Sequence, residues 1–289
     1  MAYPLCPSSL GAAIQARDAG YIDPVLVGPA RRIAALLAEM GMRAGELEIV
    51  DTPDDEKLAA RAAAALARDG AASMLMKGSL HTDHFMSAVV ARESGLRTDR
   101  RISHAFVMAV AAYPKLFILT DAAVNIAPTL QEKADIAQNA IDLARALGVQ
   151  RPKLAVLCAT ESVNPSMPAT LDAAALSKMA DRQQIRGGDI DGPLAFDNAI
   201  SRVAADQKGI VSRVAGDADI LLVPDIEAGN MLYKELTWLA GAGTAGLVLG
   251  TRVPVLLTSR SDSLQARVNS CAVAVLYARA CAASPVAPS

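Results

Sequence analysis

The chain has 289 residues, of which 52% are hydrophobic and 3% aromatic, and its formal net charge is −2. This length supports one large domain or two small ones, and the near-neutral charge excludes a globally basic nucleic-acid-binding protein. No run of about 18 apolar residues is present to span a membrane, and residues 1–20 lack the layout of a signal peptide. We therefore expect a cytoplasmic globular protein whose four cysteines, none in C-x-x-C spacing, are reduced thiols.

The first half of the chain alternates between short apolar runs and helical patterns. Residues 25–28 predict a strand, and the apolar side chains that follow, at i, i+3, i+4 and i+7, predict a helix through Met40. Thr52 supplies a hydroxyl cap and Pro53 a first helical position, so the next helix is expected to begin there and to end at Gly70. Further strands are predicted at residues 73–76, 116–120 and 154–158.

The second half continues this alternation. Thr129 is expected to cap a helix that runs to Gly148, and Thr170 to begin another that runs to about Arg182. Strands are predicted at residues 219–223, 246–249 and 253–257, and a last helix follows Ser263. Continuous aliphatic strands joined by helices are typical of an α/β fold, in which a largely parallel sheet is covered on both faces.

A cluster of hydroxyl groups around one arginine follows the strand at residues 253–257. Ser259, Arg260 and Ser261 lie between this strand and the start of the last helix. Free backbone N–H groups at a helix N-terminus, together with a guanidinium fork, make a good anion site. The simpler alternative is a helix cap at Ser261 or Ser263 beside a surface arginine.

The segment 223–234 repeats this order of strand, polar turn and helix. Asp225, Gly229 and Asn230 follow a strand, and Lys234 lies in the helix. Gly229 and Asn230 are expected to let the backbone approach a ligand closely, although a simple turn favours the same pair. Two such strand ends in one α/β chain predict a cleft for a phosphorylated ligand.

Several other kinds of site are disfavoured. No G-x-G-x-x-G follows a strand and no P-loop sequence occurs, so neither a Rossmann dinucleotide site nor a P-loop is expected. The only histidines are His81, His84 and His104. His81 and His84 have the spacing of a metal-binding pair, but the sequence offers no convincing third ligand, and we predict no metal site.

Five blocks in fixed order carry a resemblance to a known family. They are Met76-Lys-Gly-Ser-Leu-His-Thr82, Thr120-Asp-Ala-Ala-Val-Asn125, Asp191-Gly-Pro-Leu-Ala-Phe-Asp197, Pro224-Asp-Ile-Glu-Ala-Gly-Asn230 with Lys234, and Thr258-Ser-Arg-Ser-Asp-Ser263. Over essentially its full length the chain resembles the phosphate acetyl/butyryltransferase family. The resemblance is strongest to the butyryltransferase branch and to the transferase part of bifunctional enoyl-CoA hydratase/phosphate acetyltransferase proteins.

The resemblance implies a two-domain, three-layer α/β/α fold like that of isocitrate and isopropylmalate dehydrogenases. Residues 1–123 with 255–289 are expected to form one domain and residues 124–254 the other, with the active cleft between them. It also implies a homodimer that transfers an acetyl or butyryl group reversibly between coenzyme A (CoA) and inorganic phosphate, without metal or cofactor. The alternative is a non-catalytic, transferase-like domain that senses acyl-CoA.

The reaction assigns candidate roles to the residues around Arg260. In one direction the CoA thiol must become a thiolate and phosphate must leave. Arg260 is the candidate for binding the phosphate oxygens, and Ser259 for donating to the carbonyl oxygen or to phosphate. Asp262 is the candidate base. Because the acetyltransferase branch has its catalytic aspartate where this chain has Ala266, Asp262 has the alternative role of a helix-terminal carboxylate.

A second departure concerns positive charge. The acetyltransferase branch carries an active-site arginine where this chain has Met86, and we hypothesise that Lys77 supplies the missing charge. The alternative is that Lys77 is a lysine on a solvated loop. The residues expected to bind phosphate or CoA are Lys77, Gly78, Thr82, Asp225, Gly229, Asn230, Lys234 and Ser261.

Overall fold

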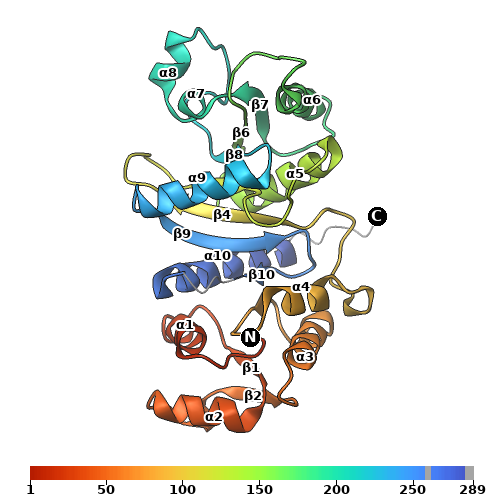
Figure 1. The fold of residues 1–289 in the computed structure, drawn as a ribbon, viewed down its shortest axis with the longest axis vertical. Coiled ribbons are helices and arrows are strands. Elements are labelled where there is room, and N and C mark those ends of the chain that lie inside the picture. The colour runs from red at the N-terminus through yellow and green to blue at the C-terminus, as the bar shows by residue number, and fades with distance from the viewer. Residues whose placement is uncertain (258–261, 284–289) are drawn as a thin grey trace. The chain divides into compact units, whose positions relative to one another are not determined.

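A computed structural model describes residues 1–257 and 262–283, and the chain divides into two compact units (Figure 1). Unit 1 comprises Met1–Arg100 together with Ala245–Ser289, and unit 2 comprises Arg101–Thr244. The chain therefore leaves unit 1 once and returns to it. The predicted domains, residues 1–123 with 255–289 and residues 124–254, and the predicted cleft between them stay predictions.

Unit 1 contains two groups of paired strands. β1 (Val25–Gly28) pairs in parallel with β2 (Glu48–Asp51). β10 (Val255–Leu256) pairs in parallel with β3 (Leu75–Met76) and antiparallel with β9 (Gly243–Leu249), which crosses the unit boundary. The longer helices of this unit are α1 (Pro7–Asp18), α2 (Ala30–Glu39), α3 (Glu56–Arg68), α4 (Thr82–Val90) and α10 (Leu264–Ala283).

The apolar face of α2 shows why this part of unit 1 is ordered. Ile33 and Leu37 are one helical turn apart and therefore point to the same side of the helix. Both are fully buried, in a cluster with Leu10 of α1 and Leu26 of β1. Because burial of each such side chain contributes roughly 1.5–3 kcal/mol, these contacts hold α2 and α1 on β1.

Unit 2 is built on strands in the order β4-β5-β8-β6-β7. β4 and β5 are antiparallel, and the remaining neighbours are parallel. The strands are β4 (Ser103–Ala109), β5 (Phe117–Thr120), β6 (Lys153–Leu157), β7 (Asp189–Leu194) and β8 (Ile220–Leu222). The helices are α5 (Leu130–Ala146), α6 (Pro168–Asp181), α7 (Phe196–Ile200), α8 (Arg202–Gln207) and α9 (Ile226–Trp238).

Helices cover both faces of this sheet (Figure 1). Leu119 of β5 and Leu221 of β8 belong to a buried cluster that Leu236 of α9 packs against. Because side chains alternate along a strand, the neighbouring Ile118 and Ile220 face the opposite side, where α5 packs on β5 and β8. The predicted α/β class with a largely parallel sheet is confirmed.

Two predicted helix starts are wrong. The helix expected to begin at Thr170 begins at Pro168, because proline suits the first helical position. The helix expected from Thr52 and Pro53 begins at Glu56, and its cap is Asp55, whose carboxylate accepts from the N–H groups of Lys57 (2.7 Å) and Leu58 (3.0 Å). The Thr52 hydroxyl instead donates to the carbonyl of Pro53. A carboxylate that accepts two backbone N–H groups is the stronger cap, and it decides where the helix begins.

Two other predicted helix boundaries, the start of α5 and the end of α3, are confirmed. Thr129 caps α5 in a capping box with Glu132, and α3 ends before Gly70, which has a φ of +78°. Strands β2, β4 and β7 were not predicted. Polar and apolar residues mix in β2 and β7, whereas residues 105–109 of β4 form an apolar run that the prediction overlooked. Among the helices in residues 1–257 and 262–283, none combines the length and hydropathy that crossing a bilayer requires.

His104 is an ionisable group in the core of unit 2. It lies in β4, is 2% exposed, and packs its ring 4.2 Å from that of Phe106. Within the described part of the chain its Nδ1 has no hydrogen-bond partner. Burial lowers the pKa of His104 from 6.5 to about 4, although the nearby Asp121 carboxylate acts to raise it. The imidazole is therefore neutral in the folded protein at neutral pH.

We expect His104 to make the protein less stable in acid. The unfolded chain binds a proton at this imidazole below about pH 6.5, whereas the folded chain does so only near pH 4. The free energy of unfolding should therefore fall by on the order of 3 kcal/mol as the pH is lowered through this window. Urea unfolding at pH 7 and pH 4.5 measures the loss, and His104→Gln should reduce it. An equal loss in both proteins would contradict the prediction.

Candidate active site

The predicted site residues fall into two sets, one in each unit. Lys77, Gly78 and Thr82 lie in unit 1 with Asp262, whereas a second set lies on α9 of unit 2. Ser259, Arg260 and Ser261, the centre of the predicted anion site, lie outside the described residues.

The pairing of β3 with β10 positions the unit 1 set. The strands are parallel, and the N–H of Lys77 donates to the carbonyl of Leu256 at 3.0 Å. Parallel strands end at the same edge of a sheet, so β3 delivers Lys77 to the edge from which β10 leads into residues 258–261. The chain therefore leaves β3 and β10 at the same edge of the sheet, although these two strands are far apart in the sequence.

Lys77 is buried, which contradicts the alternative of a solvated-loop lysine. It is 7% exposed, and its Nζ donates to the carbonyl oxygens of Leu80 (2.9 Å) and Gly78 (3.2 Å). Burying an ammonium group costs free energy unless polar groups satisfy it. These carbonyls orient the side chain inside the turn that connects β3 to α4, so Lys77 brings positive charge to this turn.

Gly78 allows the N-terminal segment to lie directly against this turn. A Cβ on Gly78 would stand 2.5 Å from the carbonyl oxygen of Tyr3 and 2.8 Å from the Cα of Pro4. The N–H of Gly78 donates to Ala2, and the Ser79 hydroxyl donates to Tyr3 at 2.8 Å. Glycine is therefore required at this position because another segment of the same chain lies too close to leave room for a side chain.

One serine of the segment at residues 258–263 has a structural role at the start of α10. Ser263 caps this helix: its hydroxyl accepts from the N–H of Ala266 at 3.1 Å, and its carbonyl accepts from Arg267. Asp262, just before the cap, is half-buried. Arg267 is 4% exposed and reaches Ser8 of α1 at 3.4 Å. The burial of this arginine was not predicted, because one arginine in a helical pattern is usually a surface residue.

In unit 2, the turn predicted at Gly229 and Asn230 is wrong, because both residues lie inside α9. Asp225 is the cap of this helix and accepts from the N–H of Ala228 at 2.9 Å. Its carboxylate ends the preceding turn sooner than expected, so the helix begins at Ile226. Lys234 follows Asn230 by one helical turn on the same face and is exposed.

Gly229 lets α9 pack closely on the chain segment after β5. A Cβ there would stand 2.7 Å from the Val223 side chain and 3.0 Å from the Cα of Ala122. Asn230 adds a hydrogen bond from its amide to the carbonyl of Ala122 at 3.3 Å. The two blocks at residues 120–125 and 224–230 are thus in direct contact.

Asp121 organises this segment, a role that was not predicted from the sequence. It is 3% exposed, and its carboxylate accepts from the N–H groups of Ala123 and Val124, both at 3.0 Å. It also accepts from the side-chain amide of Asn125 at 2.6 Å, and Asn125 in turn accepts from Arg101 Nε at 2.7 Å. The sequence signal was present: an aspartate directly after a strand, with asparagine four residues later.

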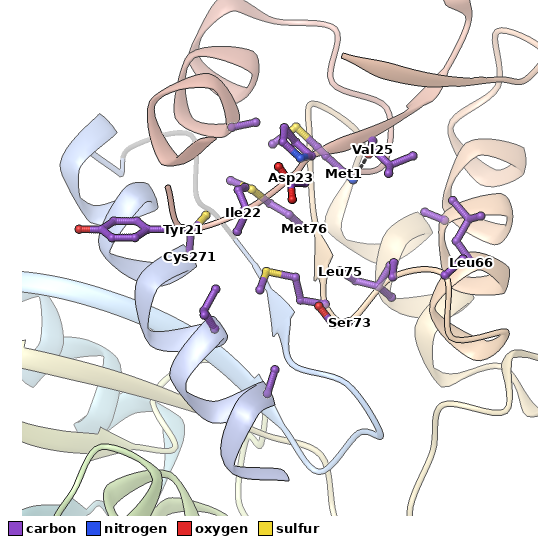
Figure 2. A pocket seen from close by; sticks show the side chains of 18 of the residues that line it. Met1, Tyr21, Ile22, Asp23, Val25, Leu66, Ser73, Leu75, Met76 and Cys271 are labelled. Atoms are coloured by element: carbon purple, nitrogen blue, oxygen red, sulfur yellow. Dashed lines mark hydrogen bonds between the residues drawn. The ribbon is translucent and has the colours of Figure 1, made fainter. Parts of the chain in front are cut away.

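A separate cavity of about 460 Å³ lies in unit 1 (Figure 2). Apolar side chains dominate its lining, among them Val25 of β1, Leu66 of α3 and Leu75 of β3. Met76, the residue before Lys77, also lines it, but of the predicted phosphate- or CoA-binding residues, none of those within residues 1–257 and 262–283 does. An apolar lining does not suit a phosphate group, so this cavity is not the site predicted from the sequence.

Comparisons with known proteins agree with the sequence blocks. A family model described as "Phosphate acetyl/butaryl transferase" matches residues 57–275. A phosphate acetyltransferase from Rhizobium meliloti is 54% identical over 99% of this chain and 90% of its own length. A phosphate butyryltransferase from Clostridium acetobutylicum is 45% identical over 93% of this chain and 89% of its own length. A branched-chain phosphotransacylase from Enterococcus faecalis V583 has a solved structure that is 33% identical, with a TM-score of 0.84, covering 96% of this chain and 97% of that one.

The close approach at Gly78 predicts a large effect from one methyl group. Gly78→Ala should lower the free energy of unfolding by about 1–3 kcal/mol, since the N-terminal segment must move away. Urea unfolding measures this change. Gly45→Ala is the matched control, because nothing lies within 4 Å of its Cβ position, and it should change stability by less than about 1 kcal/mol. Similar stabilities for the two variants would contradict the packing role of Gly78.

Proposed function

Because the chain belongs to the phosphate acetyl/butyryltransferase family, we propose that it transfers a short acyl group reversibly between CoA and inorganic phosphate. The observation that carries this proposal is the identity of 54% and 45% to the two named transferases, over about nine tenths of their own lengths. Those two relatives are named for acetyl and butyryl groups, so the proposal covers both. The overall reaction exchanges a thioester for an acyl phosphate.

The chemistry requires one proton transfer and the stabilisation of phosphate. In the direction of acyl-CoA synthesis, the CoA sulfur attacks the acyl carbonyl, the bond from that carbon to the phosphate oxygen breaks, and phosphate leaves. Asp262 accepts the thiol proton, because a thiol with a pKa near about 8.5 is mostly protonated at neutral pH. Arg260 binds two oxygens of the phosphate, and Ser259 donates to the carbonyl oxygen as charge develops on it.

The remaining candidates bind the substrates. Lys77 supplies positive charge toward phosphate in place of the arginine missing at Met86, and its burial supports a dedicated role. Gly78, Thr82 and Ser261 belong to the same two blocks of unit 1. Asp225, Gly229, Asn230 and Lys234 contribute from α9, where the cap at Asp225 and the close packing at Gly229 hold the helix in place.

We also propose that the protein works as a homodimer in the cytoplasm, with no resident metal or cofactor for the chemistry. CoA is a substrate, and acyl transfer involves no change of oxidation state. Cys6, Cys158 and Cys271 are free thiols, which supports a reducing compartment. The alternative of a non-catalytic acyl-CoA sensor is disfavoured by the two named transferases.

A turnover assay tests the proposed function. The purified protein should release free CoA from acetyl-, propionyl- or butyryl-CoA only when phosphate is present, with one acyl phosphate formed for each CoA. A thiol reagent reports the CoA and hydroxylamine traps the acyl phosphate. Tight acyl-CoA binding without turnover of any of the three would replace the transferase proposal with the sensor alternative.

Arg260 is the residue on which the phosphate step depends most. Arg260→Ala should lower the turnover rate by about 10²–10³-fold, the usual effect of removing a donor that stabilises developing charge. Arg260→Lys should lose nearly as much, because lysine lacks the bidentate fork. Thermal stability should stay within about 1 kcal/mol. The control is Arg31→Ala, which removes an exposed arginine of α2. If Arg260→Ala kept more than about a tenth of the wild-type turnover rate, phosphate would have to bind elsewhere.

A further inference from the structure

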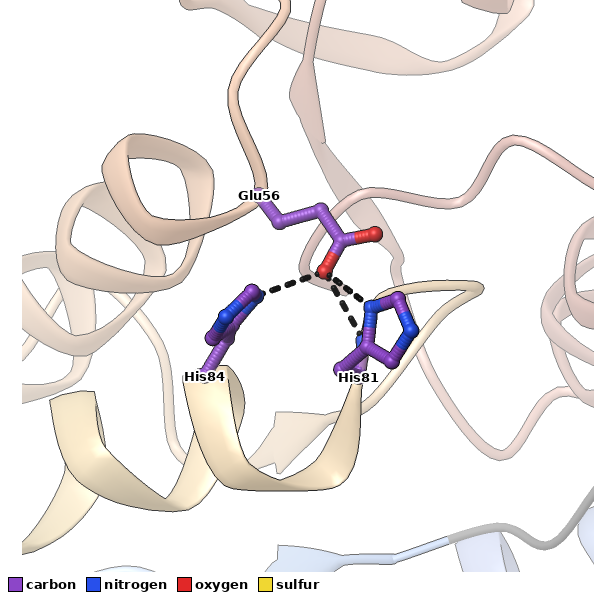
Figure 3. Close-up of side chains that lie close together, drawn as sticks. All are labelled: Glu56, His81 and His84. Atoms are coloured by element: carbon purple, nitrogen blue, oxygen red, sulfur yellow. Dashed lines mark hydrogen bonds and ion pairs between the residues drawn. The ribbon is translucent and has the colours of Figure 1, made fainter.

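Three potential metal ligands converge at the starts of α3 and α4 in unit 1 (Figure 3). Glu56 is the first residue of α3, His81 precedes α4, and His84 lies in its first turn. Glu56 Oε2 stands 2.9 Å from His81 Nδ1 and 2.8 Å from His84 Nδ1. One ligand atom from each residue lies within 4.8 Å of the others. The same nitrogen of each ring faces one carboxylate oxygen.

This spacing suits a small ion with tetrahedral coordination. Ligand bonds of about 2.0–2.2 Å separate neighbouring ligand atoms by about 3.3 Å. Glu56 Oε2 therefore needs to move only a few tenths of an ångström away from each of the two Nδ1 atoms to admit an ion. Two histidines and one glutamate form a set that binds zinc in other proteins and leaves a fourth position for water. Imidazole nitrogen favours transition metals over calcium or magnesium.

The carboxylate is already held in place for this role. The backbone N–H of His81 donates to Glu56 Oε2 at 3.0 Å, which orients the group as an outer-shell hydrogen bond orients a metal ligand.

We propose that Glu56, His81 and His84 bind one divalent transition-metal ion of the zinc type. The ion fastens the start of α3 to the start of α4. It therefore lies beside the turn at residues 77–82, where Lys77 is buried. This proposal goes beyond the proposed acyl transfer, in which the ion has no chemical step.

Two observations favour a hydrogen-bonded cluster of these side chains without an ion. Other properties of the site outweigh both. A carboxylate between two histidines is also a stable hydrogen-bonded arrangement, and a helix N-terminus such as that of α4 favours anions over cations. The dipole effect is small beside three coordinate bonds, and the negative charge of Glu56 offsets part of it. Side-chain exposures of 66% for His81 and 36% for His84 leave the ion an entry path and room for a water ligand.

Metal titration of the full chain tests the proposal. After chelator treatment and dialysis, calorimetry with ZnCl₂ should show one ion bound per chain. His84→Ala and, separately, Glu56→Gln should weaken this binding at least about 100-fold, since outer-shell partners alone contribute 10–100-fold. Zinc should raise the melting temperature of the wild type but not of these variants. Circular dichroism confirms that each variant is folded.

Asp83→Asn is the matched control, because Asp83 is exposed and lies between the two histidines. This variant should retain wild-type zinc affinity. Cobalt should give the visible absorption of a tetrahedral site without the thiolate charge-transfer band expected of binding to a cysteine. Absence of zinc binding, or equal binding by the wild type and both ligand variants, would overturn the proposal. Neither result would bear on acyl transfer, which the turnover assay measures separately.

Discussion

The parallel pairing of β3 with β10 is the interaction on which the candidate site of unit 1 depends. Backbone hydrogen bonds join Leu75 to Pro254 and Lys77 to Leu256, so two sequence blocks from opposite ends of the chain leave the sheet at one edge. The N-terminal segment then packs on the turn after β3, where only glycine fits. Lys77 is buried as a consequence, and its ammonium group is oriented by the carbonyls of its own turn.

Unit 2 relies on a buried carboxylate to position the sequence blocks at residues 120–125 and 224–230. Asp121 accepts hydrogen bonds from two successive backbone N–H groups and from Asn125, which gives the segment after β5 a single shape. α9 can then approach Ala122 because Gly229 has no side chain. A family of enzymes that binds phosphate and CoA needs such rigid supports, since its binding groups must be preorganised before charge develops.

Much of the fold was predictable because its strongest local signals agree with the tertiary structure. The aliphatic strands, the capping box at Thr129 and the glycine that ends α3 all lie where the sequence placed them. Errors came where two local signals competed, as at Thr52 and Asp55, or where a glycine was taken for a turn, as at Gly229. In both places a carboxylate cap outweighed the competing signal.

By itself, the sequence determined the α/β class, the ordered blocks and therefore the family. Periodicity and short motifs are local properties, and they need no knowledge of the folded chain. Tertiary structure alone decided that Lys77 is buried, that Gly78 faces Tyr3, and that Glu56 joins His81 and His84. Each of these depends on contacts between segments distant in the sequence. Such contacts follow from the pairing of strands and the packing of helices, which no local pattern encodes.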